Sequence, residues 1–220
     1  MVARLQSAPL TAVVADMDGT VLGCNSWPVF VRSLLRSLLR RGHWISAAAL
    51  ARKLMARRRG KITHREVKYA AARIARRHFP QRDMDRLLNR LEREVRPEVM
   101  SLLDSYPDSL RVLATAAAGE YAEALGRRLG FDRVLATMPA DCPAAGYREL
   151  RGDLKAATVK RLLAEEGLRA AAVITDSFHD LPMLRAFPEA DRVLVGPQAE
   201  TLRALEADPS LASVRIVGEI

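Results

Sequence analysis

The sequence lacks the features of a secreted or membrane-spanning protein. It has only two cysteines, Cys24 and Cys142, and they suggest neither a disulfide framework nor a zinc site. Nowhere do about eighteen apolar residues run without a charge, the length that a membrane-spanning helix needs. Asp16 and Asp18 interrupt the apolar stretch that a signal peptide would require near the amino terminus. We therefore expect a reduced, cytoplasmic protein.

Acidic residues are missing from one long stretch of the chain. None occurs between Asp18 and Glu66, and between Arg32 and Arg82 there are 16 Lys and Arg residues against Glu66 alone. This stretch carries a net charge of 16 − 1 = +15, and the whole chain carries +9, so the remainder carries −6. The difference indicates a basic module beside a mildly acidic one.

Two carboxylates follow the first strand-like run of the chain. The apolar residues 12–15 lead directly into the sequence Asp-Met-Asp-Gly-Thr at 16–20. Strand side chains alternate between faces, so Asp16 and Asp18 can project the same way where the strand ends, and Gly19 allows a sharp turn. One carboxylate could attack phosphorus while the other transfers protons. An Asp/Gly turn after a strand is also common without any such role, so partners are needed.

A hydroxyl residue at a strand end and a lysine near a helix start occur later in the sequence. Thr115 ends the strand-like run 110–115, although a threonine there often only caps a helix. Lys155 lies near the start of a helical pattern that continues to about Gly167. Lys160 is an alternative on the same helix, and Gly152, three residues before Lys155, favours the earlier lysine. Such a lysine would offset the charge of carboxylates and of a phosphoryl group.

A second pair of aspartates follows another buried strand pattern. The apolar run beginning at Ala171 leads into Asp-Ser-x-x-Asp, with Asp176 and Asp180 as its carboxylates. Helix capping would also explain these residues. The four patterns together, in this order and at these spacings, resemble the haloacid-dehalogenase superfamily, whose first motif is Asp-x-Asp-x-Thr. Within it, the position of the basic module is similar to that of the helical cap in the phosphoserine-phosphatase-like subgroup.

The resemblance implies a phosphatase. Dehalogenases of the superfamily lack the second aspartate of the first motif, and its transport ATPases carry threonine there. Asp16 would therefore be the nucleophile that forms an aspartyl-phosphate, and Asp18 the general acid and base. Thr115 and Lys155 would bind the phosphate. Transfer of the phosphoryl group to a hydroxyl other than water remains open.

The resemblance also implies a metal ion. Magnesium takes hard oxygen ligands and usually keeps several waters beside one or two carboxylates. The ion would be held by Asp16, Asp18 and Asp176, with Asp180 as an indirect or alternative ligand. We accordingly expect Mg²⁺ as the cofactor.

Motif spacing predicts the domain organisation. Asp18 and Thr115 are 97 positions apart, whereas Thr115 to Lys155 and Lys155 to Asp176 are 40 and 21, ordinary spacing for strand-helix units. We expect a helical cap at 24–105 inserted into a core made of 1–23 and 106–220. Strand-like runs in the core at 11–16, 110–115, 132–137, 171–176, 192–195 and 214–217 alternate with helical runs. They predict an α/β fold with a Rossmann-like, doubly wound parallel sheet.

The basic module allows three interpretations. Arg32, Arg36 and Arg40 recur on one helical face, with Leu34, Leu35, Leu38 and Leu39 turned elsewhere and Trp27, Phe30 and Trp44 nearby. The first interpretation is a solvated surface in a chain with 30 Arg and only 5 Lys. The second is peripheral contact with an anionic membrane, and a lipid head-group phosphatase similar to those that act on phosphatidylglycerophosphate. Nucleic acid ranks last, because no recognised motif accompanies the charge.

The substrate is expected to be a small, anionic phosphate ester. Phosphoserine phosphatases place a glutamate shortly after the first motif, but Asn25 stands near that position here, which disfavours an amino-acid phosphate. Arg32 and Arg36, together with Asn25, are the candidate substrate contacts in the cap. The histidines of the cap, His43, His64 and His78, are expected to be solvated. A non-catalytic phosphate- or lipid-binding scaffold is the remaining alternative.

Overall fold

The computed structural model describes residues 10–138 and 146–218, so Cys142 lies outside the described residues. Six strands form one sheet in which every neighbouring pair is parallel, in the order β3-β2-β1-β4-β5-β6. The strands are β1 (Thr11–Ala15), β2 (Ser109–Ala118), β3 (Arg133–Thr137), β4 (Arg169–Thr175), β5 (Asp191–Val195) and β6 (Arg215–Val217). The predicted fold class is confirmed, and each predicted strand is present with small shifts at its ends.

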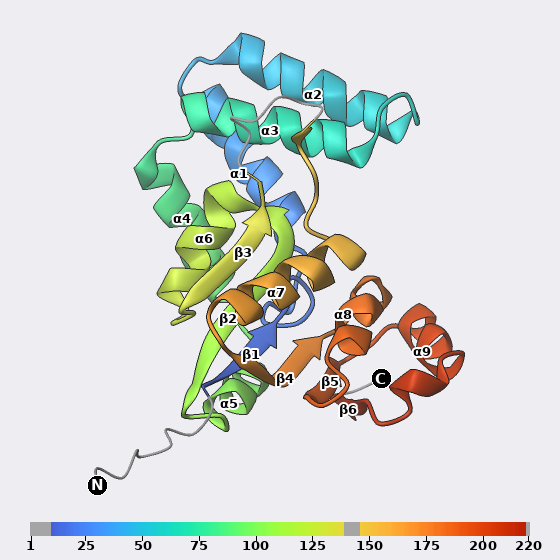
Figure 1. Cartoon of the computed structure of the whole chain (residues 1–220). Helices are drawn as coiled ribbons and strands as arrows, with labels where there is room; N and C mark the ends of the chain where they lie inside the picture. The colour runs from blue at the N-terminus through green and yellow to red at the C-terminus, as the bar shows by residue number, and fades with distance from the viewer. Residues whose placement is uncertain (1–9, 139–145, 219–220) are drawn as a thin grey trace, which may run out of the picture.

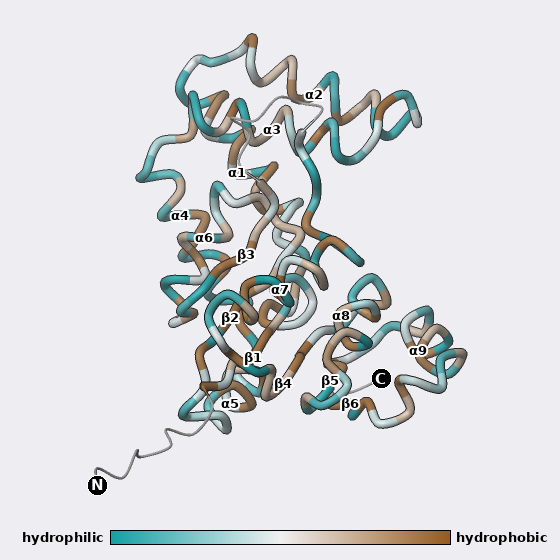
Figure 2. The backbone as a smooth tube through the Cα atoms, viewed as in Figure 1, coloured by the Kyte–Doolittle hydropathy of each residue, from teal (hydrophilic) through white to brown (hydrophobic). Residues whose placement is uncertain are grey.

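The sheet is buried on both faces, as its nearly continuous apolar strands require. Val13 and Ala15 of β1 pack toward one hydrophobic cluster, and Ala12 and Val14 pack toward the other. The first cluster includes α5 (Pro97–Asp104) and α6 (Gly119–Arg128), and the second includes α7 (Asp153–Glu165) and α8 (Leu181–Ala186). A further helix, α9 (Ala199–Glu206), lies beside the second layer. Hydrophobic segments run along β1 and β4 in the backbone trace (Figure 2).

Four helices between β1 and β2 lie beyond the carboxyl ends of the strands (Figure 1). They are α1 (Ser26–Arg40), α2 (Trp44–Arg58), α3 (His64–His78) and α4 (Gln81–Glu92), and we call them the cap. The following helix, α5, lies near the opposite end of the sheet, although it falls inside the predicted insertion. The exact boundary of the cap at residue 105 therefore stays a prediction.

The apolar side of α1 packs into the protein. Phe30 is fully buried and stacks on Tyr121 of α6, with ring centroids 4.9 Å apart. Leu34 and Leu38 are fully buried as well, so α1 joins the cap to the cluster on the sheet. Leu39 differs from the other leucines because it is 44% exposed and shares a depression with Arg36. Most of the apolar side of this amphipathic helix therefore belongs to the hydrophobic core.

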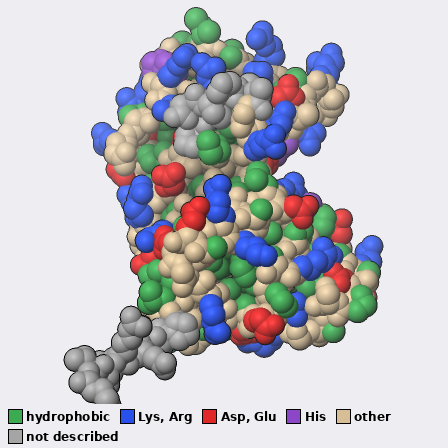
Figure 3. Space-filling view, viewed as in Figure 1, with side chains coloured by type: hydrophobic (Ala, Val, Ile, Leu, Met, Phe, Trp, Pro, Cys, Tyr) green, Lys and Arg blue, Asp and Glu red, His purple; other side chains and the backbone are tan. Residues whose placement is uncertain are grey.

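Charged side chains cover both the cap and the sheet domain, and the visible face of the molecule narrows between them (Figure 3). No helix in the described ranges is both long enough and apolar enough to cross a membrane.

Candidate active site

A cavity of about 500 Å³ lies between the cap and the carboxyl ends of the strands. Asp16 stands at its base, directly after β1, and its backbone N–H donates to the Ile174 carbonyl at 2.9 Å, which continues the pairing of β1 with β4. The chain then turns through Gly19, whose φ of +83° is a conformation that a residue with a Cβ rarely adopts. The side chain of Asp16 is thereby held where a parallel sheet offers its ligand site.

Lys155 connects two of the aspartates at the base of this cavity. It lies in the first turn of α7, which begins after Gly152 at a φ of +58°. Its ammonium is 2.6 Å from Oδ1 of Asp16 and 2.6 Å from Oδ2 of Asp180. The hydroxyl of Thr175 donates to the same oxygen of Asp180 at 2.9 Å. Lys160 is exposed, so Lys155 is the lysine that reaches the predicted site.

Asp18 is held by the first helix of the cap. The backbone N–H of Ser26, the first residue of α1, donates to Oδ1 of Asp18 at 2.9 Å. Helix N-termini favour negative charge, so this contact stabilises the carboxylate. The hydroxyl of Ser26 lies 2.7 Å from the buried hydroxyl of Tyr121, which fixes the start of α1 against α6.

Asp176 packs directly against the turn that follows β1. The hydroxyl of Thr20 donates to its Oδ1 at 3.0 Å. A Cβ added to Gly19 would lie only 2.2 Å from its Oδ2. A glycine is therefore needed at position 19 for two reasons, the positive φ and the close approach of this carboxylate.

The structure locates Thr115 close to the cavity but inside the protein. Its side chain is 1% exposed, and its Oγ1 accepts a hydrogen bond from the Ala117 N–H at 3.0 Å. The next residue of β2, Ala116, does line the cavity. A direct contact of Thr115 with phosphate stays a prediction.

Burial shifts the pKa values of the acidic groups in the same direction. It raises the pKa of Asp16 to about 7, although the Lys155 ammonium opposes the shift. It also raises the pKa of Asp18, against the hydrogen bonds from Ser26. The pKa of Asp176 is raised by burial too, with the bond from Thr20 acting in the opposite direction. In all three carboxyls, desolvation outweighs the stabilisation that the neighbouring cations and hydrogen bonds give to the charged form.

The donor set fits magnesium. Four aspartates line the cavity, Lys155 contacts two of them, and Oδ2 of Asp176 lies close to the turn at Gly19. Within the described ranges, no three His, Cys, Asp or Glu side chains form a ready-made metal cluster. Magnesium does not require one, because it commonly binds one or two carboxylates and completes its shell with water and phosphate oxygens.

Asp180 is committed to other partners. Its Oδ2 accepts hydrogen bonds from both Lys155 and Thr175, and its side chain is only 5% exposed. It lies in the short 3₁₀ turn Phe178–Asp180 that follows β4. The sequence left Asp180 as either an indirect or an alternative ligand of magnesium, and this geometry favours the indirect role.

The structure does not bring the two candidate arginines of the cap to this cavity. Arg36 lines a separate depression between α1 and α4, and Arg32 is exposed on α1 without lining the described cavity. Asn25 does line it, although its side-chain oxygen also caps α1 by accepting from the Trp27 N–H at 3.0 Å.

Other residues from distant segments take the place of these arginines. The cavity is also lined by His64 and Lys68 of α3, by Arg96, and by Glu149 and Arg151 of the segment before α7. Lys68 is 7% exposed, and its ammonium donates to Oε2 of Glu149 at 2.8 Å and to the Ala116 carbonyl at 3.1 Å. The sequence has no acidic residue between Asp18 and Glu66, but Glu149 supplies a further carboxylate to the cavity.

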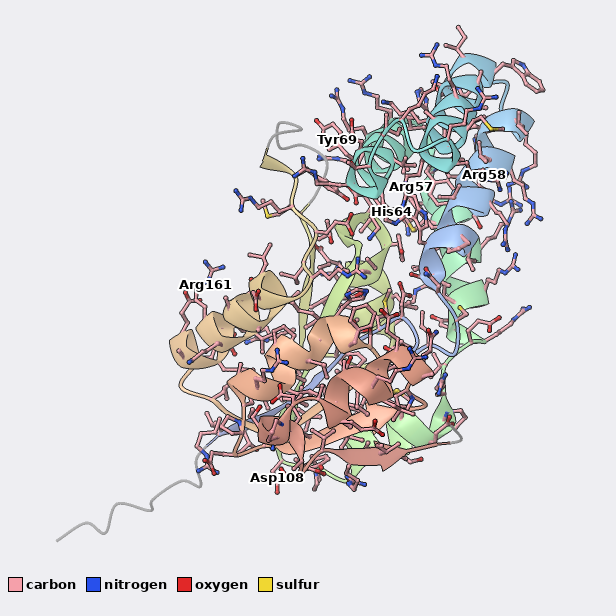
Figure 4. All side chains as sticks on the ribbon, turned by 90° about the vertical axis from the view of Figure 1, so that its right-hand side faces the viewer. Arg57, Arg58, His64, Tyr69, Asp108 and Arg161 are labelled. Atoms are coloured by element: carbon pink, nitrogen blue, oxygen red, sulfur yellow. The ribbon has the colours of Figure 1, made fainter. Side chains whose placement is uncertain are left out.

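One histidine was expected in solvent but lies at the site. His64 is half-buried, and its ring centroid is 5.4 Å from that of Trp27. Burial, with Lys68 nearby, lowers its pKa and so favours the neutral imidazole. Figure 4 labels it on the cap, near Arg57. His43 and His78 stack on each other within the cap, with centroids 4.4 Å apart.

Comparison with protein-family models decides the family. Residues 13–185 match the model of the haloacid dehalogenase-like hydrolases, a range that includes all four motifs and the cap. The chain belongs to this family. The resemblance inferred from the motifs is thereby confirmed, and so is the assignment of the chain to a family of hydrolases. No curated protein sequence matches the chain significantly.

Several solved structures share the fold of this chain at low sequence identity. A protein of unknown function from Bordetella pertussis Tohama I is 17% identical, with a TM-score of 0.69 over 96% of this chain and 99% of that one. A probable phosphoserine phosphatase from Vibrio cholerae is 14% identical, with a TM-score of 0.60 over 92% and 62%. A substrate-bound phosphoserine phosphatase is 11% identical, with a TM-score of 0.56 over 90% and 91%. These similarities establish the fold.

Proposed function

We propose that this hydrolase is a magnesium-dependent phosphomonoesterase that acts through an aspartyl-phosphate on a small anionic ester. The observation that carries the proposal is the buried Lys155 ammonium, 2.6 Å from both Asp16 and Asp180. It stabilises Asp16 as a carboxylate and leaves one of its oxygens for attack. Asp18, two residues away, supplies a second carboxyl with a different environment, as an acid-base partner requires.

In the first step, an Asp16 oxygen attacks phosphorus in line with the ester bond. A phosphorus–oxygen bond forms to Asp16 while the bond to the leaving alkoxide breaks. The protonated carboxyl of Asp18 donates its proton to that alkoxide. Burial raises the pKa of Asp18, which is the direction that a general acid needs, and this supports the assignment.

In the second step, water attacks the phosphorus of the aspartyl-phosphate. Asp18, now a carboxylate, accepts a proton from this water, and the bond between phosphorus and the Asp16 oxygen breaks. Phosphate leaves and both carboxyls return to their initial states. The Ser26 N–H holds Asp18 in one orientation through both proton transfers.

Positive charge and N–H groups would stabilise the phosphoryl oxygens during both steps. Lys155 and the backbone around Thr115 and Ala116 are the groups of this chain that we assign to that role. Asp16 and Asp176 would hold the magnesium ion through carboxylate oxygens and Asp18 through its backbone carbonyl, so that the Asp18 carboxyl stays available for proton transfer. The ion supplies further charge neutralisation when bound. Asp180 would keep Lys155 in position.

The leaving group is expected to carry a negative charge of its own. Lys68, Arg96 and Arg151 add cationic groups to the cavity lining, and Glu149 is the one carboxylate that the described lining has besides the four aspartates. Lys68 would then exchange part of its contact with Glu149 for a contact with the leaving group. This pair of opposite charges could also accommodate a leaving group that has both an acidic and an amino function.

The test is a substrate panel measured with and without magnesium. It compares kcat/KM for an aryl phosphate, a sugar phosphate, a phosphorylated hydroxy acid and a phosphorylated amino acid. The proposal predicts magnesium-dependent phosphate release and a preference for the esters that carry a second acidic group. Equal values for charged and neutral leaving groups would contradict the assignment of the substrate class. Folded protein that releases no phosphate with magnesium present would contradict the proposed reaction.

A further inference from the structure

The helix α2 presents an apolar stripe to solvent. Trp44, Ala48, Ala51 and Met55 recur at i, i+4, i+7 and i+11, so they share one face of the helix. All four are exposed, with Trp44 at 64% and Met55 at 46%, and the adjacent Ile45 is 88% exposed. Only Ala47 and Leu50 are buried in this 15-residue helix. The stripe is therefore separate from the face that packs against α1 and α3.

Basic side chains border this stripe. Arg52 and Arg58 lie on either side of it along the helix, and Arg59 follows at the helix end. The helix itself has no acidic residue, so no carboxylate within it offsets these arginines. An apolar stripe edged with arginine is the arrangement of a helix that lies in the surface of a bilayer. A single exposed apolar residue would need no explanation, but five on one short helix do.

We propose that α2 docks this protein on the surface of an anionic phospholipid bilayer. Trp44, Ile45 and Met55 enter the boundary between head groups and acyl chains, which such helices reach to a depth of about 5–10 Å. Arg52, Arg58 and Arg59 bind lipid phosphates at the same level. The indole of Trp44 is suited to this depth because one edge is apolar and its N–H is polar.

The position of α2 in the fold agrees with such docking. It is the cap helix that lies at the end of the molecule away from the sheet (Figure 1), so a flat surface can approach it. The catalytic cavity lies on the other side of the cap, between α3 and the strand ends. Docking at α2 would thus localise the enzyme without covering the cavity, and the inference stands independently of the proposed reaction.

Charge favours lipid over two other occupants of this face. A second copy of the chain would bring the arginines of α2 against those of its partner, which opposes association. Nucleic acid would satisfy the arginines but would offer the apolar stripe no comparable surface. An anionic bilayer satisfies both, because its phosphates and its acyl boundary lie at adjacent depths.

The experiment uses the full chain and vesicles without substrate. Co-sedimentation with mixed phosphatidylglycerol and phosphatidylcholine vesicles is compared with pure phosphatidylcholine vesicles. We expect binding to the anionic vesicles that falls steeply when salt is raised from about 0.1 M to about 1 M, which shortens the Debye length from about 10 Å to about 3 Å. Brominated acyl chains should quench the fluorescence of Trp44.

Matched variants distinguish vesicle binding through the apolar stripe from binding through the overall positive charge. Trp44→Ser should weaken vesicle binding about tenfold or more, because a large apolar side chain no longer leaves water. Arg52→Gln and Arg58→Gln should each weaken it roughly fivefold. Met138→Ser, at a residue 54% exposed outside the cap, and Arg161→Gln, on the sheet domain in Figure 4, should leave binding unchanged. Trp44→Ser should hydrolyse a soluble ester as the parent protein does.

Three results would overturn the proposal. The first is absence of binding to anionic vesicles by folded, active protein. The second is binding that Trp44→Ser leaves intact, which would indicate diffuse attraction to the basic cap. The third is a dimer in sedimentation velocity that Trp44→Ser converts to monomer, which would assign the stripe to a second copy of the chain.

Discussion

The ammonium nitrogen of Lys155 lies 2.6 Å from Oδ1 of Asp16, although the two residues are 139 positions apart in the sequence. The contact joins the end of β1 to the first turn of α7, and the lysine side chain is only 2% exposed. A buried ammonium needs such partners, because burial alone would lower the pKa of Lys155, whereas Asp16 and Asp180 raise it. The core of the site therefore depends on the fold as a whole.

Asp16→Asn should abolish turnover and preserve the fold. The substitution removes the charge of the proposed nucleophile at nearly constant volume, and Lys155 keeps its second partner, Asp180. We expect kcat to fall by several orders of magnitude, as with other variants that lose a nucleophile. Phosphate release and far-UV circular dichroism measure the two parts of this prediction. If Asp16→Asn does not fold, Asp16→Ser is the substitution to use for the same comparison.

The activity should fall on the alkaline side as Asp18 loses its proton. Burial raises the pKa of this carboxyl, so the acid form needed in the first step persists to higher pH than usual and is lost as pH rises through the raised pKa. Asp18→Asn should remove this limb of the kcat profile. It should slow alkyl esters by about 10²–10⁴-fold and aryl esters less, because aryl leaving groups need little protonation. Equal losses for both would contradict the role.

Gly19→Ala should weaken magnesium binding. The new Cβ would lie 2.2 Å from Oδ2 of Asp176, so this carboxylate must move. Gly60→Ala is the matched control, because its φ is +69° and nothing lies within 4 Å of its added Cβ. Both variants should lose about 1–2 kcal/mol of unfolding free energy to backbone strain. Only Gly19→Ala should need a higher magnesium concentration for half-maximal activity, and equal magnesium dependence in both would contradict the placement of Asp176.

Asp83→Asn should destabilise the cap. Asp83 is 4% exposed, and its carboxylate accepts from Ser37 at 2.6 Å, from Arg40 at 3.0 Å and from Arg41 at 3.3 Å. We expect a loss of about 1–3 kcal/mol at pH 7, limited because the arginines are half-exposed. Asp108→Asn, at the exposed residue in Figure 4, should change stability by no more than about 0.5 kcal/mol. Urea titrations give both values.

The same carboxylate predicts the pH dependence of that loss. Burial would raise the pKa of Asp83, but the bonds from Ser37 and Arg41 outweigh it and hold the pKa below its usual value. A depressed pKa contributes stability above the usual value, and this contribution disappears as pH falls through the depressed one. The difference between the parent protein and Asp83→Asn should therefore shrink in acid. A difference that stays constant with pH would contradict the ionic origin of the effect.

Lys68→Met should raise KM for an ester with an anionic leaving group about tenfold, with a smaller effect on an ester with a neutral one. The variant removes a cation from the cavity wall but leaves Glu149 without its partner. The double variant Lys68→Met/Glu149→Gln removes that unpaired charge and serves as the control. If KM recovers fully in the double variant, repulsion by Glu149 explains the defect and Lys68 does not bind the leaving group.

The strand-end residues were accessible from the sequence because local patterns encode them. Apolar runs followed by acidic residues fix both the strand and the place where it ends, as at Asp16 and Asp176. The residues that contact these groups cannot be identified from local patterns. Lys68 looks like any surface lysine in a basic helix, and Glu149 follows no motif, so only the packing of α3 on the sheet domain brings them together.

The cap was harder to interpret for a physical reason. The clear amphipathic pattern of α1 led us to expect its basic face to matter, yet its apolar side is core and Trp44 on the next helix is exposed. Helix α2 has one apolar stripe facing inward and another facing outward, so its sequence shows no single periodic face. Burial, which tells the two stripes apart, is a tertiary property.

The most direct test of the central claim is phosphate release from an aryl phosphate by the parent protein and by Asp16→Asn, each with magnesium and with a chelator. The account predicts release by the parent protein with magnesium only, and none by the variant under either condition. Release by folded Asp16→Asn at the parent rate, or release that the chelator leaves unchanged, would contradict the account.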